Sequence, residues 1–109
     1  MDIVVTREFK KNYKHLVGKY ASLRDDLIQL QIQLRENPFL GVELAGGFRK
    51  IRFAIRSKGK GKSGGGRVIT FNYIVDKECQ RIVMVKMYDK NETASVSDAE
   101  IKKAFETLE

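Results

Sequence analysis

Residues 58–67 read KGKGKSGGGR, so four basic side chains, five glycines and one serine lie within ten residues. Glycine lets a backbone come close to a ligand, and lysine and arginine attract anions, so this segment predicts a phosphate site. A nucleotide-hydrolysing Walker A loop needs a glycine five residues before its Gly-Lys-Ser, but Arg56 stands five residues before Gly61. That loop must also open a helix, whereas the VITFNY that follows here reads as a strand. Nucleotide hydrolysis is therefore not expected.

The positive charge is concentrated in one part of the chain. Residues 1–43 carry seven basic and six acidic residues, and residues 76–109 carry six basic and eight acidic ones. Residues 44–75, here called the basic third, carry eight basic residues and no acidic one, so they hold the whole excess behind the net charge of +7. This distribution predicts a surface that binds a polyanion, and it favours nucleic acid over a merely solvated basic surface.

The other reactive residue types restrict the possible chemistry. The single histidine, His15, lies beside the apolar stripe of a predicted helix and reads as a surface residue, and the single cysteine, Cys79, has no evident partner base. Asp25 and Asp26 begin a helix, where carboxylates suit the dipole. Since no cluster has metal-ligand spacing, we expect no metal and neither two-histidine nor two-metal hydrolysis. Cleavage of RNA would have to use lysine, arginine and tyrosine, with the RNA 2′-hydroxyl as nucleophile.

Three segments show helical periodicity. Each is preceded by a residue that can cap a helix, and two of these residues have an acid three positions later: Thr6, Ser22 with Asp25, and Ser97 with Glu100. The second helix should end at Asn37-Pro38, because proline disfavours helical geometry in the residue before it. The apolar stripes are Phe9, Tyr13, Leu16 and Tyr20, then Leu23, Leu27, Leu30 and Leu34, and finally Ile101, Ala104, Phe105 and Leu108.

The middle of the chain changes to the alternation of strands. Residues 48–56 place apolar and basic side chains on opposite faces, and residues 68–75 are apolar on nearly every position, as in a central strand. Residues 82–88 predict a third strand, and residues 3–5 a short opening one. In the third strand we expect Val83, Val85 and Met87 on one face, and Lys86 and Tyr88 on the other.

These elements predict a single α+β domain over residues 1–109. A small twisted antiparallel sheet would be packed by an N-terminal helical hairpin and a C-terminal helix, because short links between strands favour antiparallel pairing. We expect the helices to cover one face and to leave a basic second face. No apolar run has membrane-spanning length, the N-terminus lacks the layout of a signal peptide, and a lone cysteine suits a reducing compartment, so the cytoplasm is expected.

Five motifs in order resemble the HigB-like branch of the RelE/ParE toxin superfamily. They are NPFLG, GGFRKIR, KGKGKSGGGRVI, YDKNE and the capped helix at SDAE, and their order and spacing agree best over residues 46–92. The resemblance runs over nearly the whole chain and implies a bacterial type II toxin with a compact sheet flanked by helices. It also implies metal-independent cleavage of mRNA on the translating ribosome, and silencing by a small cognate antitoxin.

The resemblance implies a catalytic set of six residues: Arg52, Lys60, Lys62, Arg67, Tyr88 and Lys90. Lys60 or Lys62 would act as base or electrostatic stabiliser, the two arginines would clamp the phosphate, and an exposed Tyr88 would stack on a base or relay a proton. Four further basic residues are expected to bind RNA: Lys50, Arg56, Lys58 and Lys86. Asn91 and Glu92 are expected to shape the turn after the strand.

One of these positions conflicts with strand alternation. Arg67 has the same parity as Ile69, Phe71 and Tyr73, so it would point to the apolar face. It can reach the basic face only if the strand begins after it or bulges there.

Two other functions stay open. A ParE-like toxin would share the fold but poison DNA gyrase, and a non-catalytic module would only bind RNA or the ribosome. For the leading interpretation we expect a monomeric free toxin without cofactor, whose partners are an antitoxin, the ribosome and mRNA, and not a membrane.

Overall fold

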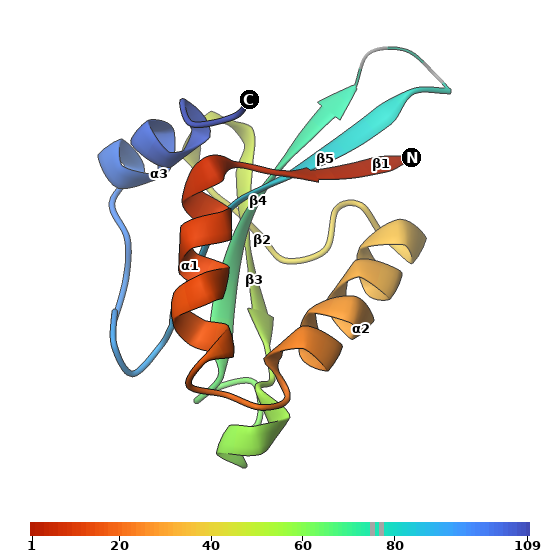
Figure 1. Cartoon of the computed structure of the whole chain (residues 1–109). Helices are drawn as coiled ribbons and strands as arrows, with labels where there is room; N and C mark the ends of the chain where they lie inside the picture. Colours follow the sequence, from red (N-terminus) through yellow and green to blue (C-terminus); the bar gives the residue numbers. More distant parts are fainter. Residues whose placement is uncertain (75, 77) are drawn as a thin grey trace.

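The computed structural model describes residues 1–74, 76 and 78–109, and it contains a five-stranded sheet with helices on both faces (Figure 1). The elements in chain order are β1 (Asp2–Val5), α1 (Arg7–Val17), α2 (Leu23–Glu36), β2 (Val42–Glu43), β3 (Phe48–Phe53), β4 (Gly66–Ile74), β5 (Gln80–Asp89) and α3 (Asp98–Phe105). The α+β class and the three predicted helices are confirmed. The predicted end of the central strand at Val75 lies outside the described residues.

The strand order in the sheet is β1-β5-β4-β3-β2. β3, β4 and β5 pair antiparallel, as predicted, and the short β2, which was not predicted, pairs antiparallel with β3. β1 pairs with β5 in parallel, with Ile3 opposite Ile82. The sheet is therefore mixed, and the prediction of a wholly antiparallel sheet is wrong for this pair. The argument from short links applies to strands that are neighbours in sequence, whereas β1 and β5 are the first and last strands of the chain.

One irregularity changes which side chains of β5 share a face. The pairing of β4 with β5 shifts its register at residues 69–70, which leaves one extra residue in β5. An extra residue in a strand changes the face to which every later side chain of that strand points. Met87 therefore faces α1 and α2, whereas Tyr88 joins Val83 and Val85 on the other face. The prediction that placed Met87 with the two valines and Tyr88 opposite them is wrong for this reason.

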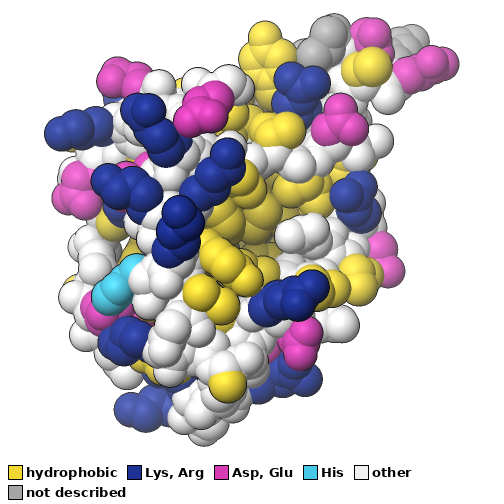
Figure 2. Space-filling view, in the orientation of Figure 1, with side chains coloured by type: hydrophobic (Ala, Val, Ile, Leu, Met, Phe, Trp, Pro, Cys, Tyr) yellow, Lys and Arg dark blue, Asp and Glu magenta, His cyan; other side chains and the backbone are white. Residues whose placement is uncertain are grey.

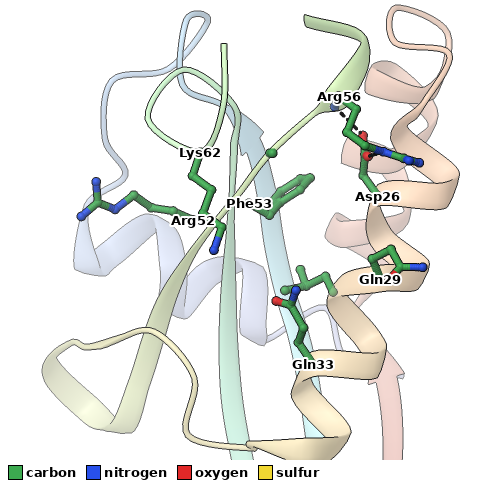
Figure 3. Close-up of a pocket in the computed structure, with 9 residues that line it drawn as sticks. Asp26, Gln29, Gln33, Arg52, Phe53, Arg56 and Lys62 are labelled. Atoms are coloured by element: carbon green, nitrogen blue, oxygen red, sulfur yellow. Dashed lines mark hydrogen bonds and ion pairs between the residues drawn. The ribbon is translucent and has the colours of Figure 1, made fainter. Parts of the chain in front are cut away.

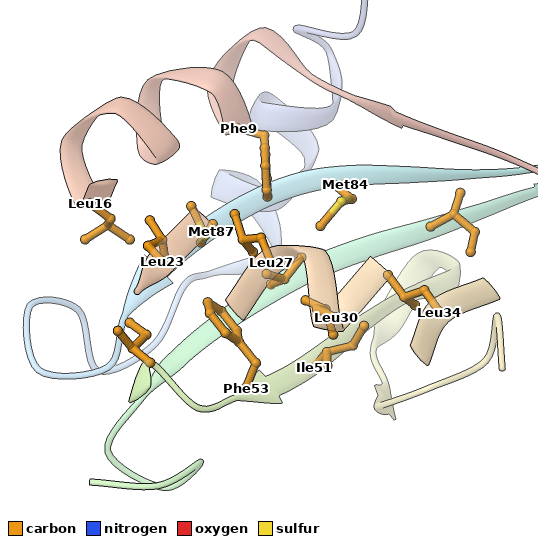
Figure 4. Packing of buried hydrophobic residues seen from close by; sticks show 13 residues of the cluster. Phe9, Leu16, Leu23, Leu27, Leu30, Leu34, Ile51, Phe53, Met84 and Met87 are labelled. Atoms are coloured by element: carbon orange, nitrogen blue, oxygen red, sulfur yellow. The ribbon is translucent and has the colours of Figure 1, made fainter. Parts of the chain in front are cut away.

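Each face of the sheet has its own apolar core. The core under α1 and α2 contains Phe9, Leu16, Leu23, Leu27, Leu30, Leu34, Ile51, Phe53, Ile55, Val68, Ile82, Met84 and Met87 (Figure 4). On the other face, Ile101 and Ala104 of α3 pack with Phe48, Ile69, Val83, Val85 and Tyr88. The expectation that all helices cover one face is wrong, because the second face is itself apolar over part of its length and is buried there by α3.

The helices keep two of their three predicted caps. Thr6 and Ser97 accept hydrogen bonds from main-chain amides of the first turn, but Ser22 makes no such bond. Its hydroxyl instead donates to the Asp26 carboxylate at 2.7 Å and accepts from the Ser57 amide at 2.8 Å. α1 and α2 diverge from their connection (Figure 1), and Figure 2 shows apolar side chains in the hollow between them. No helix among the described residues is long and apolar enough to cross a membrane.

Two threonines are completely buried, but their hydroxyls differ in bonding. Thr6 Oγ1 accepts from the Phe9 amide at 3.0 Å and donates to the Val85 carbonyl at 2.7 Å, so it ties the start of α1 to β5. Thr70 Oγ1 has no hydrogen-bond partner in the part of the chain that the structure describes.

We expect substitution of threonine by valine to change the free energy of unfolding in opposite directions at these two positions. Thr6→Val should lower the free energy of unfolding by about 1–2 kcal/mol, because a helix cap and a buried hydrogen bond are both lost. Thr70→Val should raise it by about 1 kcal/mol, because an unpaired buried hydroxyl is removed. Urea unfolding followed by circular dichroism measures both values. A similar loss in the two variants would contradict this account.

Candidate functional site

A row of three side chains crosses β3, β4 and β5. Arg52 stands opposite Arg67, and Arg67 stands opposite Tyr88, so all three side chains lie on the face that α3 partly covers. Arg52 is exposed, whereas Arg67 and Tyr88 are only 5% and 6% exposed. Strand pairing thus brings three of the six predicted catalytic residues together; they are called the arginine–tyrosine row below.

Arg67 reaches this row without a bulge in its own strand. It shares a face with Ile69 and Phe71, as alternation predicts, and both of those residues belong to the core under α3. The same face also carries Arg52 beyond the end of α3. The face therefore has an apolar part under α3 and a basic part beyond the helix. Arg67 can thus share a face with Ile69 and Phe71 and still lie beside Arg52, which was the conflict that strand alternation raised.

The Arg67 guanidinium holds the segment of residues 58–65 before β4, called the glycine-rich loop below. Its Nη1 donates to the carbonyls of Lys62 and Gly66, each at 3.0 Å, and its Nη2 donates to the carbonyl of Ser63 at 3.3 Å. Burial lowers the pKa of Arg67, the neighbouring Arg52 charge lowers it further, and Tyr88 opposes this shift. No carboxylate forms an ion pair with Arg67 within the described residues. Main-chain carbonyls therefore orient this buried cation and tie the loop to the row.

Glycines let this loop turn and return closely against β3. Gly59 and Gly61 have φ values of 71° and 61°, in the left-handed region that favours glycine. A Cβ on Gly65 would lie 2.2 Å from the Phe53 carbonyl oxygen, so no other residue fits there without movement of the backbone. The loop is thus a closely packed turn, and it presents Lys60 and Lys62 as exposed side chains.

The turn after β5 lies beside this loop. The Lys90 amide donates to the Gly65 carbonyl at 3.1 Å, and the Lys90 side chain is exposed, so the third predicted lysine joins the same region. Tyr88 is buried, which contradicts the expectation that it is exposed; the extra residue in β5 turns it toward the core under α3. Burial raises the pKa of Tyr88, and the Arg67 charge only partly offsets this, so the phenol is protonated at neutral pH.

The four residues expected to bind RNA are placed differently. Lys50 is half-buried and lies on the same face as the row, two residues before Arg52 in β3 and opposite Ile69. The other three form ion pairs within the protein: Arg56 with Asp26 at 2.8 Å, Lys58 with Asp89 at 2.6 Å, and Lys86 with Glu8 at 3.3 Å. The Lys58 side chain is only 5% exposed, so it does not offer its charge to a ligand at the surface.

Asp89 is a central residue that the sequence analysis passed over. It is 1% exposed and accepts hydrogen bonds from the Lys58 ammonium, the Tyr20 hydroxyl and the Asn91 amide. Burial by itself raises the pKa of Asp89, but these hydrogen bonds outweigh it and lower the pKa below its ordinary value. The spacing from Asp89 to Asn91 is that of an Asx turn, a local signal that was available, whereas Lys58 and Tyr20 are 31 and 69 residues away in sequence.

The remaining polar residues at this end form the turn and the surface. The amides of Asn91 and Glu92 donate to Asp89, so both residues shape the turn as expected. His15 is 59% exposed and its Nε2 lies 2.9 Å from the Glu92 carboxylate, which confirms its position at the surface. Over the described residues, no group of three or more His, Cys, Asp and Glu side chains could hold a metal ion.

Comparison with known protein families gives one match over almost the entire chain. The family described as "RelE toxin of RelE / RelB toxin-antitoxin system" matches residues 1–108. The matched range includes every strand and helix, the arginine–tyrosine row and the glycine-rich loop.

Asp89→Asn should lower the free energy of unfolding at neutral pH by about 3–5 kcal/mol, because the buried Lys58 ammonium loses its partner charge. The folded-state pKa of Asp89 is lowered, so its contribution is complete above the unfolded pKa of about 3.9 and is lost as the pH falls through the folded value. The difference from the wild type should therefore shrink in acid. Urea unfolding at a series of pH values measures this difference.

Asp25→Asn is the matched control, because Asp25 is exposed at the start of α2 and should contribute less than about 1 kcal/mol. Equal unfolding free energies for Asp89→Asn and the wild type at neutral pH would contradict the assigned role.

Proposed function

The chain belongs to the RelE toxin family of toxin–antitoxin systems, and from this premise we propose that it is an endoribonuclease that cleaves mRNA on the translating ribosome. The observation that carries the proposal is the arginine–tyrosine row, which joins two guanidinium groups and a protonated phenol beside the exposed lysines of the glycine-rich loop. The same proposal assigns the chain to a HigB-like branch of the family. It also has the protein act in the cytoplasm, on mRNA that is bound to the ribosome. A cognate antitoxin is the partner that membership of the family implies.

The proposed reaction uses the nucleophile that RNA itself carries. The 2′-oxygen attacks the adjacent phosphorus, the new O2′–P bond forms, and the P–O5′ bond breaks. The products are a 2′,3′-cyclic phosphate and a 5′-hydroxyl end. One proton must leave the 2′-hydroxyl, another must reach the departing 5′-oxygen, and the charge that grows on the non-bridging oxygens must be stabilised.

Arg52 and Arg67 are suited to stabilise that charge. A guanidinium group can donate two parallel hydrogen bonds to phosphate oxygens. Three loop carbonyls already fix the orientation of Arg67, so little reorganisation is needed when the phosphate arrives. Exposed Lys60, Lys62 and Lys90 are placed around the row. One of the two loop lysines, in its neutral amine form, would accept the 2′-hydroxyl proton, and the others would supply positive charge.

Tyr88 is better suited to donate a proton than to stack on a base. Its ring is buried against the core under α3, so it offers no free face to a nucleotide. Its pKa is raised, which keeps the hydroxyl protonated at neutral pH. Of the two roles predicted from sequence, these facts favour the proton relay, with the 5′-oxygen as acceptor.

Arg52→Ala tests the proposal without disturbing the fold, because the Arg52 side chain is exposed and forms no ion pair with the described part of the protein. Cleavage of a defined mRNA in a bacterial translation extract, mapped by primer extension, should slow by roughly 10²–10³-fold. Arg24→Ala, which removes the same charge from an exposed position on α2, should cleave like the wild type.

Two outcomes would count against the nuclease. Intact mRNA with the wild-type protein in an extract that is actively translating would reject it, and a test of DNA gyrase activity would follow. Equal cleavage by Arg52→Ala and the wild type would remove Arg52 from the site.

A further inference from the structure

A groove adjoins the arginine–tyrosine row on the other side of β3. It has a volume of about 310 Å³ and lies between α2, the end of β3 and the glycine-rich loop (Figure 3). Its floor is apolar and contains Leu30, Phe53 and Ala54. Gln29 and Gln33 line it from successive turns of α2, and Arg52, Arg56 and Lys62 supply positive charge around it. The proposed reaction uses neither of these two glutamines.

The edge of β3 is open along this groove. β2 pairs only with Arg49 and Lys50, so no described strand covers the following residues of β3 on that side. Figure 3 shows Arg52 leaving β3 on the side away from α2, while Lys62 reaches down beside the strand. Arg52 and Lys62 line the groove and also belong to the predicted catalytic set, so a chain held on the row can continue over this edge into the groove.

The charges of the groove suit a phosphate-linked ligand. Asp26 is its only acid among the described lining residues, and that carboxylate is buried and bonded to the Arg56 side chain, the Arg56 amide and the Ser22 hydroxyl. Its negative charge is therefore compensated. Arg52 and Lys62 form no ion pair with the described residues, so Lys62 offers its charge beside the groove and Arg52 offers its own on the row across β3.

The Gln33 carboxamide suits a nucleobase. Figure 3 shows the Gln33 amide directed across the groove toward β3 and Lys62. A carboxamide offers a donor and an acceptor in one plane and can pair with the edge of a base, while apolar side chains contact the ring of an unstacked base. An acidic peptide would satisfy the cations equally well, but its carboxylate side chains would leave the apolar floor without a ring to contact.

We propose that this groove binds the base of an RNA nucleotide next to the scissile phosphate, and that Gln33 selects that base through its hydrogen-bonding edge. The inference rests on the proposed function for the claim that the bound RNA is a substrate. The binding itself can be measured without cleavage.

The first experiment follows the side-chain amide signals of glutamine by NMR during addition of a short 2′-O-methyl oligoribonucleotide, which has no 2′-hydroxyl and cannot be cleaved. The signals of Gln33 and Gln29, assigned from the Gln33→Ala and Gln29→Ala variants, should shift. Those of Gln31, which lies on α2 outside the groove, should not. An abasic strand of the same length should leave all three unchanged.

The same titration can overturn the inference in two ways. Shifts confined to the loop amides of residues 60–62 would mean that RNA contacts the row alone. Shifts of Gln33 with a polyglutamate peptide but not with the oligonucleotide would make the groove a peptide site.

The second experiment maps cut sites in the translation extract. Gln33→Ala should still cleave mRNA, but its preference among codons should change by roughly tenfold at the position that the base contact reads. Gln31→Ala should keep the wild-type pattern. An unchanged pattern in Gln33→Ala, together with loss of cleavage in Arg52→Ala, would reject the base site and leave the nuclease intact. Shifted glutamine signals together with intact mRNA would reject the nuclease and leave the base site.

Discussion

The ion pair between Lys58 and Asp89 joins the segments on which the candidate site depends. Lys58 begins the glycine-rich loop, Asp89 ends β5 beside Tyr88, and Tyr20, which also bonds to Asp89, belongs to the connection between α1 and α2. Both charged side chains are nearly completely buried. An unpaired charge at this depth would be strongly unfavourable, so the contact constrains all three segments at once. The exposed loop lysines keep a defined position because the loop is fixed by this pair at one end and by Arg67 at the other.

Much of the architecture could be predicted from the sequence because it follows from local patterns. The stripe at Leu23, Leu27, Leu30 and Leu34 is sufficient to define α2. The alternation in residues 48–56 is sufficient to define β3 and to place Arg52 on the face opposite Ile51 and Phe53, although the strand ends at Phe53 and not at residue 56. The parallel pairing of β1 with β5 could not be predicted in this way, because it joins strands that are distant in sequence. The position of Tyr88 depends on one extra residue in β5, which only the pairing with β4 reveals.

In the candidate site, too, features that depend on neighbouring residues could be predicted, and features that depend on residues distant in sequence could not. The presence of Arg52, Lys60, Lys62 and Arg67 in one basic segment follows from composition, and Lys58 in the same segment is predicted to bind RNA. Burial and an acidic partner 31 residues away separate Lys58 from the others, and no pattern within the basic third contains that partner. Gln29 and Gln33 were overlooked for a related reason. They lie on the polar side of a helix that the leucine stripe already explains, and only the position of β3 gives them a common groove.

The arrangement of Arg52 and Arg67 is itself unfavourable for the fold. Like charges opposite each other on neighbouring strands destabilise a sheet, and burying Arg67 removes part of its hydration. Three loop carbonyls compensate the buried guanidinium only in part, since none of them carries a full negative charge. An apolar or acidic residue at either position would relieve the repulsion, whereas an RNA phosphate would relieve it only in the bound state. Local rules of stability are broken most often where a protein acts on a ligand. The repulsion within the row is therefore physical support for an anion as the ligand of this surface.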